Sequence, residues 1–154
     1  VLVAVAILAL VAAAAIGNAM KAVQLSNAAD KLASDLRYAQ TMAYGTALWY
    51  GVSIEVNPLN YYTIYTTTGT IDTVVENPAK LGSPFVVNLY DEYRTIISSV
   101  EISGGNKVEF NPLGTPYSDK LASAISQEGV ITLRIDSTTK TVRITPNTGR
   151  IYIQ

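Results

Sequence analysis

The sequence opens with an unbroken apolar run. Residues 1–16 read VLVAVAILALVAAAAI, without a charged or polar side chain. A helix that packs on a water-soluble domain has a polar face, and this run has none. At about 1.5 Å per residue, a helix of this length covers roughly 24 Å, a little less than the ~30 Å hydrocarbon layer of a membrane. The pattern predicts a helix that is buried either in a membrane or among other helices.

Three interpretations of this run compete: a secretory signal peptide, an ordinary membrane anchor, and the core-forming helix of a filament subunit. A signal peptide starts with basic residues, whereas Val1 already lies in the apolar run, so this interpretation is disfavoured. A plain anchor is more often followed by a flexible linker than by more helix. The residues after position 17 therefore separate the other two.

Residues 18–47 continue the helix with a different pattern. No proline interrupts them, and apolar side chains recur at spacings of three and four, namely Leu25, Ala28 or Ala29, Leu32, Leu36, Ala39 and Ala43. Polar side chains are expected to cover the remaining surface, namely Lys21, Gln24, Asp30, Lys31, Ser34, Asp35, Arg37 and Thr41. A continuous helix over residues 1–47 would be roughly 70 Å long, far more than one membrane needs. We expect its first half to pack against copies of itself and its stripe to pack on the protein's own sheet.

The weakest helical point is Gly17 followed by Asn18. Glycine costs ~1 kcal/mol relative to alanine in a helix, and the asparagine side chain competes for backbone hydrogen bonds. We predict local melting or a bend over residues 16–19 in the assembled form. A straight helix that tolerates the glycine is the alternative.

After Gly51 the apolar period changes to two, which indicates strands. Residues 52–56 and 61–67 predict a hairpin around the NPLN turn, and residues 68–83 predict a surface loop. Alternation resumes at residues 85–89. Strands at residues 95–102 and 107–110 are expected to form a second hairpin around the SGGN turn. The last part predicts a meander over residues 131–135, 142–144 and 151–153, with polar partners on its solvent face, namely Thr132, Arg134, Thr141, Arg143, Arg150 and Tyr152.

A long helix followed only by antiparallel strands predicts an α+β fold, with the helix stripe packed on one sheet face. We expect an apolar helix at residues 1–17, an amphipathic helix at 18–47 and an antiparallel β head domain at 48–154. At 154 residues the chain is long enough for one compact domain with an appendage.

Composition narrows the function classes. Histidine and cysteine are absent, which removes the commonest general base, the usual zinc ligands and thiol nucleophiles. No enzymatic activity and no cofactor or metal is expected. Asp91-Glu92 and Ser118-Asp119-Lys120 carry catalytic residue types, but neighbours along a turn imply no catalytic geometry. Ten tyrosines against two phenylalanines suggest exposed strand faces with polar-tipped rings.

One group of basic residues is a candidate nucleic-acid site. Lys140, Arg143 and Arg150, with Arg134, give the final meander a local positive excess, and Tyr152 could stack on a base. The formal net charge of −1 supplies no chain-wide attraction for nucleic acid. Because acids such as Asp136 dilute the patch, we favour a solvated strand face, and nucleic acid is not the expected partner.

The chain resembles the type IV pilin and pseudopilin superfamily, and more narrowly its branch of GspH-like pseudopilins and FimT-like minor pilins. Five segments carry the resemblance: the apolar residues 1–16, LASDLRYAQ at 32–40, YGV at 50–52, VEFNPLG at 108–114 and TPNTGRI at 145–151. Each is short, but their order and spacing span nearly the whole chain. The family's cleavage motif with its glutamate, a mid-helix proline and a C-terminal cysteine pair are not seen, and we expect about six residues to precede Val1 in the family's pattern.

The resemblance implies export through the inner membrane, processing by a prepilin peptidase and assembly into a helical filament around bundled N-terminal helices. The residues expected to pack in the filament core are Val1, Leu2, Val5, Leu8, Ala9, Ala12 and Ile16. The expected function is a structural subunit of a type IV pilus or pilus-like extracellular filament, with identical subunits and the assembly machinery as partners. One alternative is a minor pseudopilin of a type II secretion system, and a second is a minor pilin that binds DNA for uptake.

Overall fold

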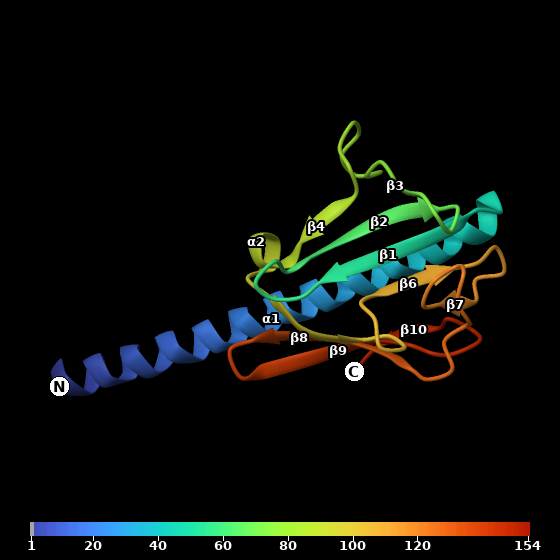
Figure 1. The fold of residues 1–154 in the computed structure, drawn as a ribbon. Coiled ribbons are helices and arrows are strands. Elements are labelled where there is room, and N and C mark those ends of the chain that lie inside the picture. Colours follow the sequence, from blue (N-terminus) through green and yellow to red (C-terminus); the bar gives the residue numbers. More distant parts are fainter. Residues whose placement is uncertain (1) are drawn as a thin grey trace.

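One long helix is the central element of the structure. The structure is a computed structural model that describes residues 2–154, with the side chains of residues 15–154. Helix α1 spans Leu2–Thr46 without interruption, which confirms the predicted helix. Its first half extends away from the rest of the protein, and its second half lies along the strands (Figure 1). Within the part of the chain that the structure describes, no helix is both long and apolar enough to cross a membrane.

The first sheet contains six strands in the order β3-β2-β1-β6-β7, with β4 also paired to β2. Their bounds are β1 Trp49–Glu55, β2 Tyr61–Thr67, β3 Asp72–Val74, β4 Val86–Asn88, β6 Lys107–Phe110 and β7 Pro116–Tyr117. All pairings are antiparallel, and Val52 lies opposite Ile64 in the β1–β2 pair. The predicted first hairpin is therefore confirmed, and the predicted loop over residues 68–83 includes the short strand β3.

The second sheet contains four antiparallel strands in the order β10-β9-β8-β5. Their bounds are β5 Ile96–Glu101, β8 Gly129–Ile135, β9 Thr138–Ile144 and β10 Ile151–Ile153. The last three strands are the predicted meander. Ile131, Leu133, Val142 and Ile144 are fully buried, whereas Arg134 is exposed, as the alternating pattern predicts.

The predicted second hairpin is wrong. Strand β5 pairs with β8 in one sheet, and β6 pairs with β1 in the other. The SGGN turn closes only an isolated bridge between Ile102 and Gly105, after which the chain passes from the second sheet to the first. Paired glycines indicate a tight turn, but the choice of strand partner depends on burial. Here Ile102 and Val108 are both fully buried.

A short helix, α2 at Leu89–Tyr93, ends the strand predicted at residues 85–89. The Asn88 side chain caps it, because its carbonyl oxygen accepts the backbone N–H groups of Tyr90 and Asp91 at 2.9 and 3.1 Å. The helix ends at Arg94, whose left-handed backbone has a φ of 54°. Leu89 remains in the core, as the alternation predicts, although its backbone is helical.

The core lies between the second half of α1 and the two sheets. The predicted stripe is confirmed, since its members are at most 1% exposed: Leu25, Ala28, Ala29, Leu32, Leu36, Ala39 and Ala43. Helix α1 contacts β1 and β6 of the first sheet and β8, β9 and β10 of the second. Alanines at the contact allow strand backbones to approach the helix closely, so one stripe can bury part of both sheets.

Polar contacts fix the end of α1 to both sheets. The Gln40 side chain donates from Nε2 to the carbonyl of Gly114 at 2.8 Å, after β6, and to that of Thr148 at 3.3 Å, between β9 and β10. A Cβ at Gly149, where φ is +63°, would lie 2.7 Å from the Gly114 oxygen and 2.5 Å from Gln40 Nε2. Glycine is therefore required here. Three segments of the family resemblance, 32–40, 108–114 and 145–151, meet at this point.

The expected surface position of Asp35 is wrong, and the expected exposure of the strand tyrosines has three exceptions. Asp35, expected on the surface of the helix, is only 6% exposed, and its carboxylate accepts hydrogen bonds from Tyr62 Oη and Lys31 Nζ, each at 2.6 Å. Tyr50, Tyr62 and Tyr65 are buried instead of lying on exposed strand faces. Burial, followed by the Asp35 charge, raises the pKa of Tyr62 far above its usual range, so its hydroxyl stays protonated as a donor.

The Asp35–Tyr62 contact predicts a stability difference along α1. Replacing Asp35 by alanine leaves the buried Tyr62 hydroxyl without its acceptor and should lower the free energy of unfolding by about 1–3 kcal/mol. Asp30→Ala, on the exposed side of the same helix, should change it by less than about 0.5 kcal/mol. Urea unfolding followed by circular dichroism measures both, and equal effects would show that the contact adds no stability.

Candidate assembly surface

The head domain stops covering α1 at Leu25, which is 1% exposed. On the N-terminal side of this residue, Ile16, Met20 and Val23 are 62%, 60% and 57% exposed. These are large apolar side chains at spacings of three and four, so they lie along one side of the helix. This segment of α1 presents an apolar surface that the protein's own head does not cover.

The exposed apolar side chains face away from the head domain. With 3.6 residues per turn, Ile16, Met20 and Val23 lie about 170° around the helix axis from the buried stripe that begins at Leu25. They form a groove of about 350 Å³ with Ala19 and Gln24. Because the head lies on the opposite side of the helix, only another molecule or a membrane can cover this groove. We call Ile16, Ala19, Met20 and Val23 the outer stripe.

The structure places one of the predicted filament-core residues. Ile16 belongs to the outer stripe and is exposed in the single chain. The other six lie outside the residues whose side chains the structure describes: Val1, Leu2, Val5, Leu8, Ala9 and Ala12. Met20 and Val23 were missed at the sequence level, because residues 18–47 were assigned one stripe that faces the sheet. Their spacing from Ile16 is the signal that identifies them.

Gly17 and Asn18 lie within the continuous helix α1. A Cβ at Gly17 would have no atom within 4 Å, so no side chain of the head requires a glycine there. The predicted melting or bend concerns the assembled form and stays a prediction.

Two variants test whether assembly needs a weak point at residue 17. Gly17→Ala should strengthen the helix by about 1 kcal/mol without a steric clash. If the assembled helix melts there, this variant should form fewer filaments in electron micrographs. Adding Asn18→Gly to the same chain restores the weak point one residue later and should restore filaments. Normal filament numbers for Gly17→Ala alone would contradict the predicted bend.

The predicted nucleic-acid residues make separate contacts. Lys140 Nζ donates to Ser26 Oγ at 3.1 Å, and Arg143 Nη1 pairs with Glu128 Oε2 at 2.6 Å. Arg150 is exposed, with its guanidinium 5.6 Å from the centre of the Tyr152 ring. Hydrogen bonds from Tyr152 and then from Arg143 lower the pKa of Glu128, so this carboxylate stays charged beside Arg143. Glu128, just before β8, therefore offsets part of the positive excess.

The other charged clusters of the head hold the fold together. Glu109 is 1% exposed and accepts hydrogen bonds from Tyr65 Oη, Lys107 Nζ and the backbone N–H of Lys120. Asp119 also pairs with Lys107, and this hydrogen bond lowers the pKa of the Asp119 carboxyl. Among the described residues no three acidic side chains gather as a metal site would require. Satisfied hydrogen bonds of this kind indicate a structural role.

No protein-family model and no curated protein matches the chain. Solved structures do match. The type IV minor pilin FimU of Pseudomonas aeruginosa aligns with a TM-score of 0.56 at 15% identity, over 84% of this chain and 87% of that one. A second crystal form of FimU gives a TM-score of 0.55 at 14% identity, over 84% and 92%. The minor pseudopilin EpsH of the type 2 secretion system of Vibrio cholerae gives 0.62 at 11% identity, over 85% and 96%.

These matches confirm the predicted architecture, a long N-terminal helix packed on antiparallel sheets. They include a type IV minor pilin and a minor pseudopilin, the two groups that the sequence resembles. The chain has the pilin-like α+β fold of type IV minor pilins and minor pseudopilins.

Proposed function

We propose that the chain is a structural subunit of a type IV pilus or a pilus-like extracellular filament, and that it polymerises with identical copies through the first half of α1. The outer stripe is the observation that carries this proposal. It is apolar and exposed, it faces away from the head, and it continues the apolar run of residues 1–16. The helices of other subunits offer the same kind of surface and can cover it.

The energetics favour burial of this surface. Each large apolar side chain contributes roughly 1.5–3 kcal/mol when it moves fully from water to an apolar environment. Ile16, Met20 and Val23 are each more than half exposed in the single chain. Before assembly, the inner membrane would cover the apolar run, and in the filament, neighbouring helices would replace the lipid.

Lysine substitutions test the packing. Leu8→Lys places a charge in the proposed helix bundle, where it costs at least ~2.5 kcal/mol per subunit by analogy with a membrane centre, so filaments should be lost. Met20→Lys should weaken assembly through the outer stripe. Leu121→Lys is the control, because Leu121 is 71% exposed on a loop of the head. Circular dichroism should show a folded head in all three. Normal filaments from Leu8→Lys would exclude the helix as the filament core.

The alternative is a minor pseudopilin of a type II secretion system. One observation favours it: the alignment with EpsH covers 96% of that protein at a TM-score of 0.62. The same outer stripe would serve this role, because a pseudopilin also needs a surface through which it joins other subunits.

Deletion of the gene in its host separates the two functions. Electron microscopy counts surface filaments, and an assay of exported proteins in the medium measures secretion. Loss of all surface filaments with normal secretion supports the pilus subunit. Loss of secretion with normal filaments supports the pseudopilin, and no change in either would contradict both.

A further inference from the structure

The two most exposed large apolar side chains among the described residues both lie on the head. Leu81 is 84% exposed and Leu113 is 79% exposed. Single exposed apolar residues are common on protein surfaces, so each position has to be judged by what surrounds it. Leu81 lies between β3 and β4, and Leu113 lies between β6 and β7. These are different sides of the head with different surroundings.

Leu81 lies at the tip of a hairpin that its own backbone holds closed. The N–H of Lys80 donates to the carbonyl of Asn77 at 3.0 Å, that of Ser83 donates to Lys80 at 3.1 Å, and that of Asn77 donates to Ser83 at 2.9 Å. Figure 1 shows this loop between β3 and β4 projecting from the first sheet, away from α1. Because the tip is already ordered, a partner that binds it loses little conformational entropy.

Leu113 lines a groove of about 250 Å³ at the opposite edge of the same sheet. The strand order β3-β2-β1-β6-β7 places the hairpin at one edge and the β6–β7 turn at the other. The groove lies between this turn and the last turns of α1, and its lining contains no charged side chain, namely Gln40, Thr41, Tyr44, Leu113 and Gly114. The Tyr44 ring and Leu113 supply apolar walls that can accept a leucine.

The hairpin tip and the groove also have complementary charge. Among the described side chains no carboxylate pairs with Lys80, the neighbour of Leu81. The groove borders the last turn of α1, which contains no basic residue. The last carbonyls of a helix carry a partial negative charge, and a lysine nearby is favourable. A hairpin that places Leu81 in the groove can bring Lys80 to this helix end.

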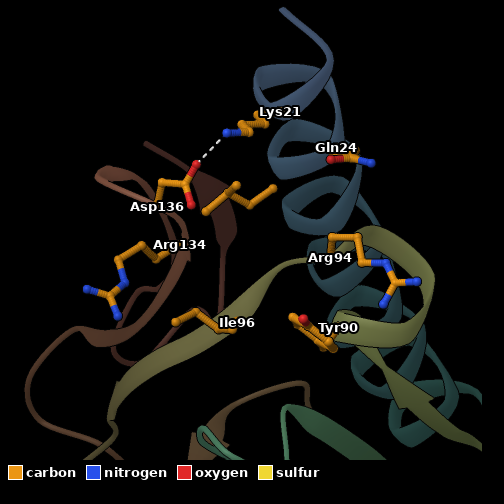
Figure 2. A pocket seen from close by; sticks show the side chains of 8 residues that line it. Lys21, Gln24, Tyr90, Arg94, Ile96, Arg134 and Asp136 are labelled. Atoms are coloured by element: carbon orange, nitrogen blue, oxygen red, sulfur yellow. Dashed lines mark hydrogen bonds and ion pairs between the residues drawn. The ribbon is translucent and has the colours of Figure 1, made fainter. Parts of the chain in front are cut away.

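The larger cavity of about 490 Å³, at the other end of the head, does not suit the hairpin tip. Its lining includes three cations, Lys21, Arg94 and Arg134, against the one carboxylate of Asp136. Figure 2 shows Lys21 paired with Asp136, and Arg94 and Arg134 on opposite walls. Like charges repel, so this lining would oppose the approach of Lys80.

The hairpin and the groove of one chain lie at opposite edges of its sheet, so only a second copy can bring them together. The contact would join two different surfaces. Each pair of copies then keeps one free hairpin and one free groove, to which further copies can add in the same way. Such heterologous contacts build open helical filaments when the rotation between copies does not close a ring.

We propose that the Leu81 hairpin of one subunit binds in the Tyr44–Leu113 groove of a neighbouring copy and links the heads side by side. The inference rests on the proposed function and adds a second contact to it. The outer stripe packs among helices, whereas the hairpin contact joins head to head. Leu81 and Leu113, both exposed in the single chain, become buried together.

Cysteine cross-linking tests the contact directly, because the chain has no cysteine of its own. Leu81→Cys and Leu113→Cys are introduced together into the full-length chain, and filaments isolated from the host are treated with a short bis-maleimide. A denaturing gel should show a ladder of dimers, trimers and longer oligomers. Each single variant should stay monomeric. Tyr44→Cys replaces Leu113→Cys in a second pair, which should give the same ladder.

Two further variants provide controls for position and charge. Leu81→Cys with Leu59→Cys should give no ladder, because Leu59 is exposed in the β1–β2 turn, outside the groove. Lys80→Gln should slow the cross-linking of the Leu81–Leu113 pair roughly two- to fivefold, the effect of one charge near a helix end. Lys140→Gln makes the same charge change outside hairpin and groove, where Lys140 contacts Ser26 of its own chain, and should not slow it.

The outcomes separate this contact from the proposed function. Normal filaments in electron micrographs without a ladder from either pair would overturn the contact and leave the helix-packed filament standing. A dimer from Leu81→Cys alone would mean that two hairpins meet, and a ladder from the Leu59 pair would mean random collision; both contradict the contact. A wild-type chain that forms no filament in its host would overturn the proposed function and this contact with it.

Discussion

The structure depends on the burial of one helix stripe that runs from Leu25 to Ala43. The two sheets are separate, and the helix contacts strands of both. Burying this stripe therefore fixes the helix, the first sheet and the second sheet to one another. The head ends where the stripe ends, so the outer stripe on the N-terminal side of Leu25 is not covered by the described part of the chain. The division into a covered and an uncovered half of one helix underlies the proposed assembly.

Polar contacts fix the position of α1 along and around its axis on the sheets. The Asp35 carboxylate accepts a hydrogen bond from the Tyr62 hydroxyl, which links α1 to β2. The Gln40 side chain donates hydrogen bonds to backbone carbonyls in the segments that follow β6 and β9. A helix that packed only through alanines and leucines could slide or rotate by a turn at little cost. These hydrogen bonds would be lost in a shifted arrangement. The Tyr62–Asp35 bond is buried, and an unsatisfied buried polar group costs about 1–3 kcal/mol. They therefore select one alignment of the helix on the sheets.

Local periodicity predicted much of this fold. The helix, its buried stripe, the first hairpin and the final meander follow from apolar spacing within short segments. The pairing of β5 with β8 was not predictable from the SGGN turn, because partner choice depends on residues about 30 positions apart. Asp35 was assigned to the surface because its partner Tyr62 is distant in sequence. Met20 and Val23 show the same limit, since their exposure depends on where the head ends.

The central claim is that the protein polymerises through α1. The apolar surface of this helix faces away from its own head and is covered by copies of the same helix. Negative-stain electron microscopy of full-length material purified from its host tests this most directly. The account predicts fibres built from this chain, with the helices inside and the heads outside. A detergent-solubilised monomer that never forms fibres in the host would contradict it.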